Sequence, residues 1–151
     1  MKRARVLIFA VVLSAIPALG QIETLTIPAG SPEDKDLTAI TSEQDNQKKI
    51  SMYQDYLQKY SANLTAVAYA NWQLAQVYQS SGDLQKALEA GDKATTAAPH
   101  NLDILVSQVT IAEQLKNSAA MFKYAIAGGE VYNSIDKETK PADVTADQFA
   151  S

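Results

Sequence analysis

The chain has 151 residues, enough for one domain, of which 46% are hydrophobic and 20% are charged. It contains no cysteine, which excludes disulfides, thiol chemistry and a lipid anchor on cysteine. The formal net charge is −4, and all the arginines lie in the first five residues. Without residues 1–20 the chain is more acidic and has no arginine, which argues against nucleic acid or an anionic lipid surface as partner.

Residues 1–20 have the pattern of a secretory signal peptide. Three basic residues precede the apolar run 6–16, and the small residues Ala18 and Gly20 fit the subsites of signal peptidase. We expect cleavage after Gly20, which leaves Gln21 as the mature N-terminus of a periplasmic or secreted protein. The alternative is a retained membrane anchor, although the apolar run is shorter than the roughly 20 residues that span a bilayer.

Residues 21–30 contain proline and glycine and predict a linker that can hold a short extended piece. The first helix is expected after it, from Ser31 as N-cap and Pro32 in the first turn, with Leu37 and Ile40 on a narrow apolar stripe.

A second helix is expected to start at Asp45-Asn46 and to end at 61–63. Its apolar side chains are spaced as on one helical face. They are Ile50, Tyr53, Tyr56, Leu57 and Tyr60.

The third and fourth helices are predicted at 64–81 and 84–97. Gly82 and Asp83 join them in a tight turn, and joints this short make neighbouring helices antiparallel.

The fifth helix is predicted over 102–116, with an apolar stripe of Leu102, Leu105, Val106, Val109 and Ala112. The sixth is expected to begin near Ser118 and to run through Gly128-Gly129 to about residue 135, where glycine would let a neighbouring helix approach closely. We expect a helical domain over 31–135, and a loop with a further helix start over 136–151 that fits a continuing repeat array.

The segment 68–101 resembles one unit of the tetratricopeptide repeat family. The residues at the family's spacing are Leu74, Ala75, Tyr78, Gly82, Asp83, Ala87, Ala94 and Pro99. The flanking segments resemble degenerate repeats. The resemblance implies an all-α protein, a right-handed α-solenoid of about three antiparallel helix pairs.

The resemblance also implies roles for these residues. Leu74 and Tyr78 would fill the space between the paired helices, small Ala75 and Ala87 would permit their close crossing, and Ala94 would pack toward the next repeat. Two residues depart from the family pattern. Trp72 lies one place beyond the usual aromatic, and Gly91 replaces a bulky residue.

In this family the opposite face of the first helix of each repeat lines a concave groove for a peptide or partner protein. By resemblance, nine residues would line the groove here. They are Tyr69, Trp72, Gln76, Gln79 and Ser80 of the third helix, and Asp103, Val106, Thr110 and Glu113 of the fifth. The alternative is that Tyr69 and Trp72 simply pack against the preceding helix pair. Trp72 and Gln76 stand where family members that hold chaperone carboxylate tails present Lys, Arg and Asn, which argues against that ligand.

Nothing in the sequence predicts catalysis, a metal or a cofactor. His100 is the only histidine and has no second His or Cys for a metal site. The acidic clusters Glu33, Asp34 and Asp36, and Glu43 and Asp45, are explained by their position at helix starts, where the helix dipole favours negative charge.

The leading hypothesis is therefore an exported, non-enzymatic scaffold that binds a protein or peptide partner without nucleic acid, and without stable membrane insertion after signal cleavage. Two alternatives stay open: a structural subunit that self-associates, and an accessory, non-catalytic part of an envelope enzyme.

Overall fold

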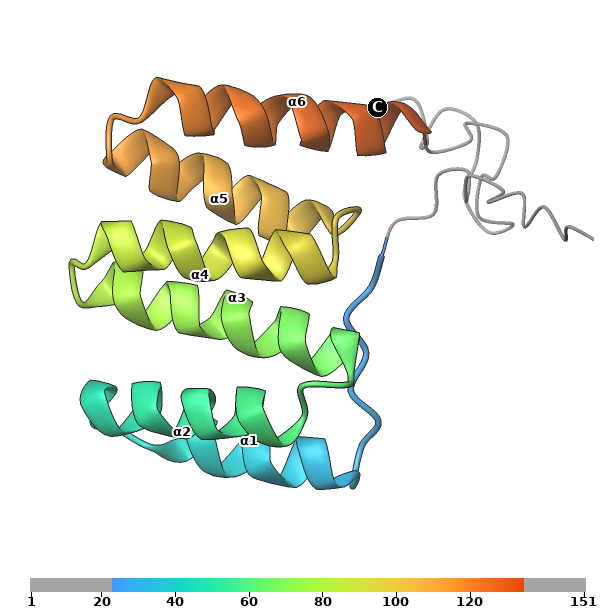
Figure 1. Cartoon of the computed structure of the whole chain (residues 1–151), viewed down its shortest axis with the longest axis vertical. Helices are drawn as coiled ribbons and strands as arrows, with labels where there is room; N and C mark the ends of the chain where they lie inside the picture. The colour runs from blue at the N-terminus through green and yellow to red at the C-terminus, as the bar shows by residue number, and fades with distance from the viewer. Residues whose placement is uncertain (1–22, 135–151) are drawn as a thin grey trace, which may run out of the picture.

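The computed structural model describes residues 23–134, which form six helices and, within that range, no strand. The chain reverses direction at each joint, and the helices follow one another in chain order along the long axis of the molecule (Figure 1). The helices are α1 (Pro32–Ser42), α2 (Asn46–Lys59), α3 (Leu64–Ser80), α4 (Leu84–Ala97), α5 (Leu102–Gln114) and α6 (Ser118–Ser134). The all-α prediction is confirmed for the described residues, and the expected helix ends lie within two residues of the observed ones.

Each helix from α1 to α5 begins at a side chain that accepts a hydrogen bond from a backbone N–H of its first turn. These N-caps are Ser31, Asp45, Asn63, Asp83 and Asn101. The predicted starts of α1 and α2 are confirmed by Ser31 and Asp45. Local capping chemistry thus sets where the helices begin.

The α3–α4 and α5–α6 joints have the same backbone form. Gly82 has φ +80° in the first joint and Lys116 has φ +55° in the second. In each joint the next residue, Asp83 or Asn117, donates its N–H across five residues to a carbonyl of the preceding helix at 2.9 Å. The Gly-Asp turn predicted from the sequence therefore recurs with lysine in the left-handed position.

The pairing of α3 with α4 follows the pattern of their small residues. Ala75 and Ala87 are fully buried at the crossing, Leu74 is buried beside them, and Tyr78 is half-buried against the same core. Ala94 packs with Ile104 of α5, as expected of a residue that faces the next helix pair. The small alanine side chains let the two helices approach closely, and this approach buries the apolar stripe of each helix.

Gly91 allows a close approach of α5 to α4. A Cβ atom added at Gly91 would lie 1.8 Å from Oε1 of Gln108, a side chain that is 1% exposed. The Gln108 amide donates to the Leu88 carbonyl at 3.0 Å. A polar side chain of α5 thus fills the space that the missing side chain of Gly91 leaves.

Two expectations for the C-terminal pair are wrong. Val106 is 62% exposed and does not join the buried stripe, whereas Ile104, Gln108 and Ile111 are buried, because α5 packs against α4 on one side and α6 on the other. The glycine pair does not mediate a close helix contact. A Cβ at Gly128 would meet only Leu105 at 3.9 Å, and one at Gly129 would meet nothing within 4 Å.

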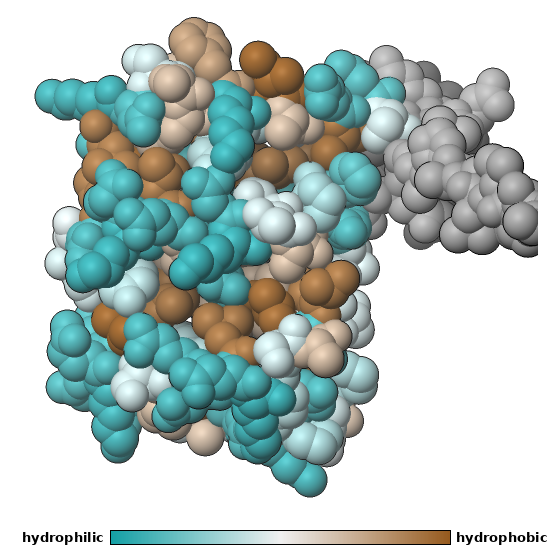
Figure 2. All heavy atoms as spheres, in the orientation of Figure 1, coloured by the Kyte–Doolittle hydropathy of each residue, from teal (hydrophilic) through white to brown (hydrophobic). Residues whose placement is uncertain are grey.

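The helix α6 continues through its glycines, as predicted, and it leaves large apolar side chains uncovered by the described residues. Tyr124 and Val131 face the core, while Phe122, Ile126 and Tyr132 are each more than 60% exposed. Figure 2 shows apolar surface at the α6 end of the molecule, above bands of hydrophilic side chains.

The predicted signal peptide and the segment 136–151 lie outside the described residues. Among the helices of residues 23–134, none is both long enough and apolar enough to cross a membrane.

Candidate partner-binding face

A non-helical segment lies across the start of α3. Residues 23–27, here called the strap, lead from the joint between α4 and α5 toward the start of α1, along the side of the molecule where α3 and α5 begin (Figure 1). These residues belong to the predicted linker. They are packed on the helices, and the expected short extended piece is present there.

Tyr69 and Trp72 lie next to each other on α3, with ring centroids 6.5 Å apart and ring planes at 88°. Trp72 packs with Leu25 of the strap against a cluster formed by Ala68 of α3, Ala94 of α4, the α4 C-cap Ala98 and Ile104 of α5. The Trp72 Nε1 atom is buried and has no hydrogen-bond partner among the described residues. The apolar cluster that Trp72 joins therefore includes residues of the strap, α3, α4 and α5.

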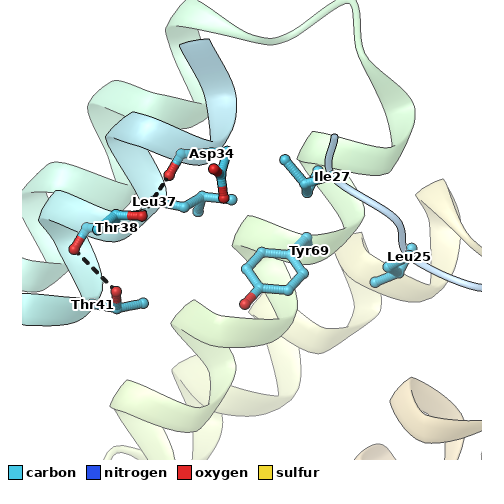
Figure 3. A pocket seen from close by; sticks show the side chains of 7 residues that line it. All are labelled: Leu25, Ile27, Asp34, Leu37, Thr38, Thr41 and Tyr69. Carbon is cyan, nitrogen blue, oxygen red and sulfur yellow. Dashed lines mark hydrogen bonds between the residues drawn. The ribbon is translucent and has the colours of Figure 1, made fainter. Parts of the chain in front are cut away.

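Tyr69 lines an open cleft of about 290 Å³ between α1, α3 and the strap. Figure 3 shows Tyr69 between Leu25 and Ile27 of the strap and the residues of α1. The α1 side of this cleft consists of Asp34, Leu37, Thr38 and Thr41. Tyr69 thus lies beside α1 of the preceding helix pair, which agrees for this residue with the alternative that it packs there.

A second cleft, of about 330 Å³, opens between the first helix pair and α3. Gln76 and Ser80, two of the predicted groove residues, line it together with Tyr53. Burial raises the pKa of the Tyr53 hydroxyl to about 12, so this group stays neutral at physiological pH. The cleft offers amides, hydroxyls and an apolar edge, which suits hydrogen bonding to an uncharged backbone.

On α5 the predicted groove residues Asp103, Val106, Thr110 and Glu113 are all exposed. None of them lines the two clefts described above. Of the predicted groove residues on α3, Gln79 bonds to α5. Its side-chain amide donates to the side chain of Gln114 at 3.2 Å. The structure therefore groups Tyr69 with Trp72 and Gln76 with Ser80, and leaves the α5 residues as a separate exposed row.

Sequence reasoning missed the strap side chains and their polar anchor, Asn101. Asn101 is 4% exposed, caps α5 through Oδ1, and donates from Nδ2 to the Glu23 carbonyl at 2.7 Å. The available signal was the alternation of Glu23, Leu25 and Ile27 with two threonines, which is typical of an extended segment with one packed face.

The acidic residues of α1 have structural partners. Asp36 accepts bonds from Lys59 at 2.7 Å and from the Tyr60 hydroxyl at 2.8 Å, and these bonds lower its pKa. Glu33 and Asp34 lie in the first turn of α1. Within the described residues no three His, Cys, Asp or Glu side chains gather as a metal site would require. The described acidic residues of α1 therefore have roles in ion pairing, hydrogen bonding and the first turn of the helix.

Comparison of the chain with protein-family models, with curated proteins and with solved structures found no match.

Proposed function

We propose that this protein is a non-enzymatic scaffold that binds an extended peptide segment of a partner protein across α3 and α5. The proposal includes a tetratricopeptide-like, right-handed solenoid arrangement of the three helix pairs. It also includes export through the signal sequence at residues 1–20, which would put the partner in the periplasm or outside the cell.

The observation that supports it best is the surface along α3. Two clefts, of about 290 and 330 Å³, open along this helix, and each has one tyrosine and hydroxyl groups in its lining. Aliphatic side chains complete most of the first cleft, and amide side chains line the second. Charged side chains are few among the described residues there, since Asp34 is the one charged residue lining the first cleft and Lys49 the one lining the second. Rings at fixed positions with neutral hydrogen-bonding groups suit a peptide backbone with apolar side chains.

The test is selection of peptides from a random display library against the chain that begins at Gln21, followed by affinity measurement with two matched variants. Val106 on α5 and Ile126 on α6 are 62% and 61% exposed, so lysine at either position leaves the core intact. We expect Val106→Lys to weaken the selected peptides by about tenfold, the scale of one lost apolar contact and an added charge. Ile126→Lys should leave affinity unchanged. Equal affinities for wild type and Val106→Lys would contradict binding across α5.

The second candidate is a self-associating structural subunit. It is favoured by the uncovered side chains of α6, where Phe122, Ile126 and Tyr132 are exposed together on one helix. Light scattering separates the two functions. A dimer of the chain that Ile126→Lys converts to monomer, and that Val106→Lys leaves intact, would establish self-association through α6.

A further inference from the structure

The strap is bound as a peptide would be. Glu23, Leu25 and Ile27 are half-buried against the helices, whereas Thr24 and Thr26 between them are exposed. This alternation is that of an extended chain with one face on a surface. The two aliphatic side chains line the same cleft as the ring of Tyr69 (Figure 3).

The strap has a polar anchor at its first residue. Glu23 donates its N–H to the His100 carbonyl at 3.3 Å and receives the Asn101 amide on its own carbonyl at 2.7 Å. Its carboxylate accepts the His100 backbone N–H at 2.8 Å, just before α5 begins. Three bonds therefore fix the direction and register of one residue, and the rest of the strap is held by side-chain packing.

The apolar contacts lie at the second and fourth positions after Glu23. Leu25 packs with Trp72 against the cluster of α3, α4 and α5, and Ile27 packs against the main core. Open space remains on both sides of the strap, about 290 Å³ beside α1 and about 170 Å³ beside the end of α4. A segment flanked by open clefts and joined to the helices at one end can leave without unfolding them.

We propose that the strap is an internal occupant of the partner-binding face and that its side chains state the chemistry of the partner. The partner is an extended segment with an acidic residue followed at the second and fourth positions by branched aliphatic residues. This inference rests on the proposed peptide-binding function and specifies its ligand. The strap competes with the partner because attachment gives it an effective concentration on the order of millimolar.

The test uses a fluorescent peptide of residues 21–29 and the chain from Gln21 to Ser151. In one variant Leu25→Ser and Ile27→Ser together remove the packed side chains of the strap, and in its matched control Thr24→Ser and Thr26→Ser alter only the exposed ones. The double aliphatic variant is expected to bind the peptide about tenfold or more tightly than wild type, because its own strap has lost both apolar contacts and competes less. The threonine control should behave as wild type. A peptide with serine for both aliphatic residues should bind to none of the chains.

The position of the added peptide is tested through Asn101. In the double aliphatic variant, Asn101→Asp keeps the cap oxygen of α5 and removes the donor to the Glu23 carbonyl, so peptide affinity should fall several-fold. Asn117→Asp is the matched control, because Asn117 also accepts from its helix through Oδ1, at 3.1 Å, and lies away from the strap. Equal effects of the two changes would overturn the assignment.

Other outcomes also decide between the possibilities. If the double variant is folded by circular dichroism and binds no strap peptide, the strap is only a structural brace and the inference fails. In that case, retained binding of library-selected peptides leaves the proposed function standing, and loss of both refutes both. If the double variant does not fold, Leu25→Ala alone replaces it, with affinity expected between wild type and the double variant. A wild-type dimer that becomes monomeric in the double variant would place the strap in a second copy and overturn the intramolecular assignment.

Discussion

Lys116 occupies a backbone conformation that favours glycine. Its φ is +55°, in the joint that corresponds to the one where Gly82 has φ +80°. The left-handed conformation costs a residue with a Cβ atom about 1–2 kcal/mol relative to glycine. Part of this difference is offset, because glycine loses more backbone freedom than other residues when the chain folds.

We therefore expect Lys116→Gly to raise the free energy of unfolding by about 0.5–1 kcal/mol. Gly82→Ala is the opposite change at the equivalent position, where an added Cβ would meet no atom within 4 Å, and it should lower stability by about 1 kcal/mol. Urea unfolding of both variants provides the measurement. A loss of stability in Lys116→Gly would contradict the equivalence of the two joints.

Gly91 and Gln108 fill one space between α4 and α5. Gly91→Ala should destabilise the protein by about 1–3 kcal/mol, because the new methyl group overlaps a buried side chain that is held by its bond to Leu88. Gly129→Ala is the matched control and should be neutral or stabilising, since nothing lies near that position in α6. Thermal unfolding of the two variants checks this, and equal midpoints would show that Gln108 moves aside freely.

At the scale of whole elements, the α1–α2 joint depends on one carboxylate. Glu43 bonds Lys48 at 2.6 Å and accepts the backbone N–H groups of Gln44 and Asp45. The bond to Lys48, followed by the two backbone bonds, lowers the pKa of Glu43 from 4.5 to about 2. The ionised form is thus favoured in the folded state more than in the unfolded chain.

The sign of the pH dependence follows from that lowered pKa. The contribution of Glu43 to stability is complete above pH 4.5 and is lost as the pH falls toward about 2. Glu43→Gln should reduce the loss of stability across this window. Glu89→Gln, which changes a carboxylate bonded to Gln85 within α4, is the control. Urea unfolding above and below the window gives the comparison. An acid-induced loss that is the same in both variants would exclude a role for Glu43.

The two ends of the helix set share another device. Lys59 of α2 and the α2 C-cap Tyr60 donate to Asp36 of α1, and Lys123 and Tyr124 of α6 donate to Asp92 of α4. In each case consecutive Lys and Tyr residues donate hydrogen bonds to one aspartate on another helix. These ion pairs are exposed to solvent, so they serve mainly to fix helix register and add little stability.

At the scale of the whole molecule, helix ends and pairing could be predicted from local chemistry. The N-caps Ser31, Asp45 and Asp83 mark where their helices begin. The small residues Ala75 and Ala87 indicate that α3 and α4 cross closely. The strap could not be predicted from helical periodicity, because its position depends on contacts with α3 and with the distant joint at His100. The burial of Ile104 and Ile111 was not predicted for a related reason. The helix α5 contacts α4 on one side and α6 on the other, and a single apolar stripe accounts for only one of these two buried sides.

The same limit applies to the candidate face. Helical periodicity predicted that Tyr69 and Trp72 face away from the contact between α3 and α4. For Trp72 this is wrong, because it packs on a cluster that contains Ala94 of α4. Periodicity within one helix is silent about a segment from another part of the chain. The groove residues on α5 remain a prediction, since exposure alone does not identify a binding surface.

Trp72 gives the most direct test of peptide binding at this face, because it is the only tryptophan in the chain and packs with Leu25 against the same cluster. Removing Leu25 and Ile27 should shift Trp72 emission to longer wavelength, as water reaches the ring. Adding the unlabelled strap peptide to that folded double variant should return the emission to the wild-type position, with saturation at a single site. Emission that is unchanged by the peptide, in a variant shown to be folded, would contradict the proposal that this face binds an extended segment.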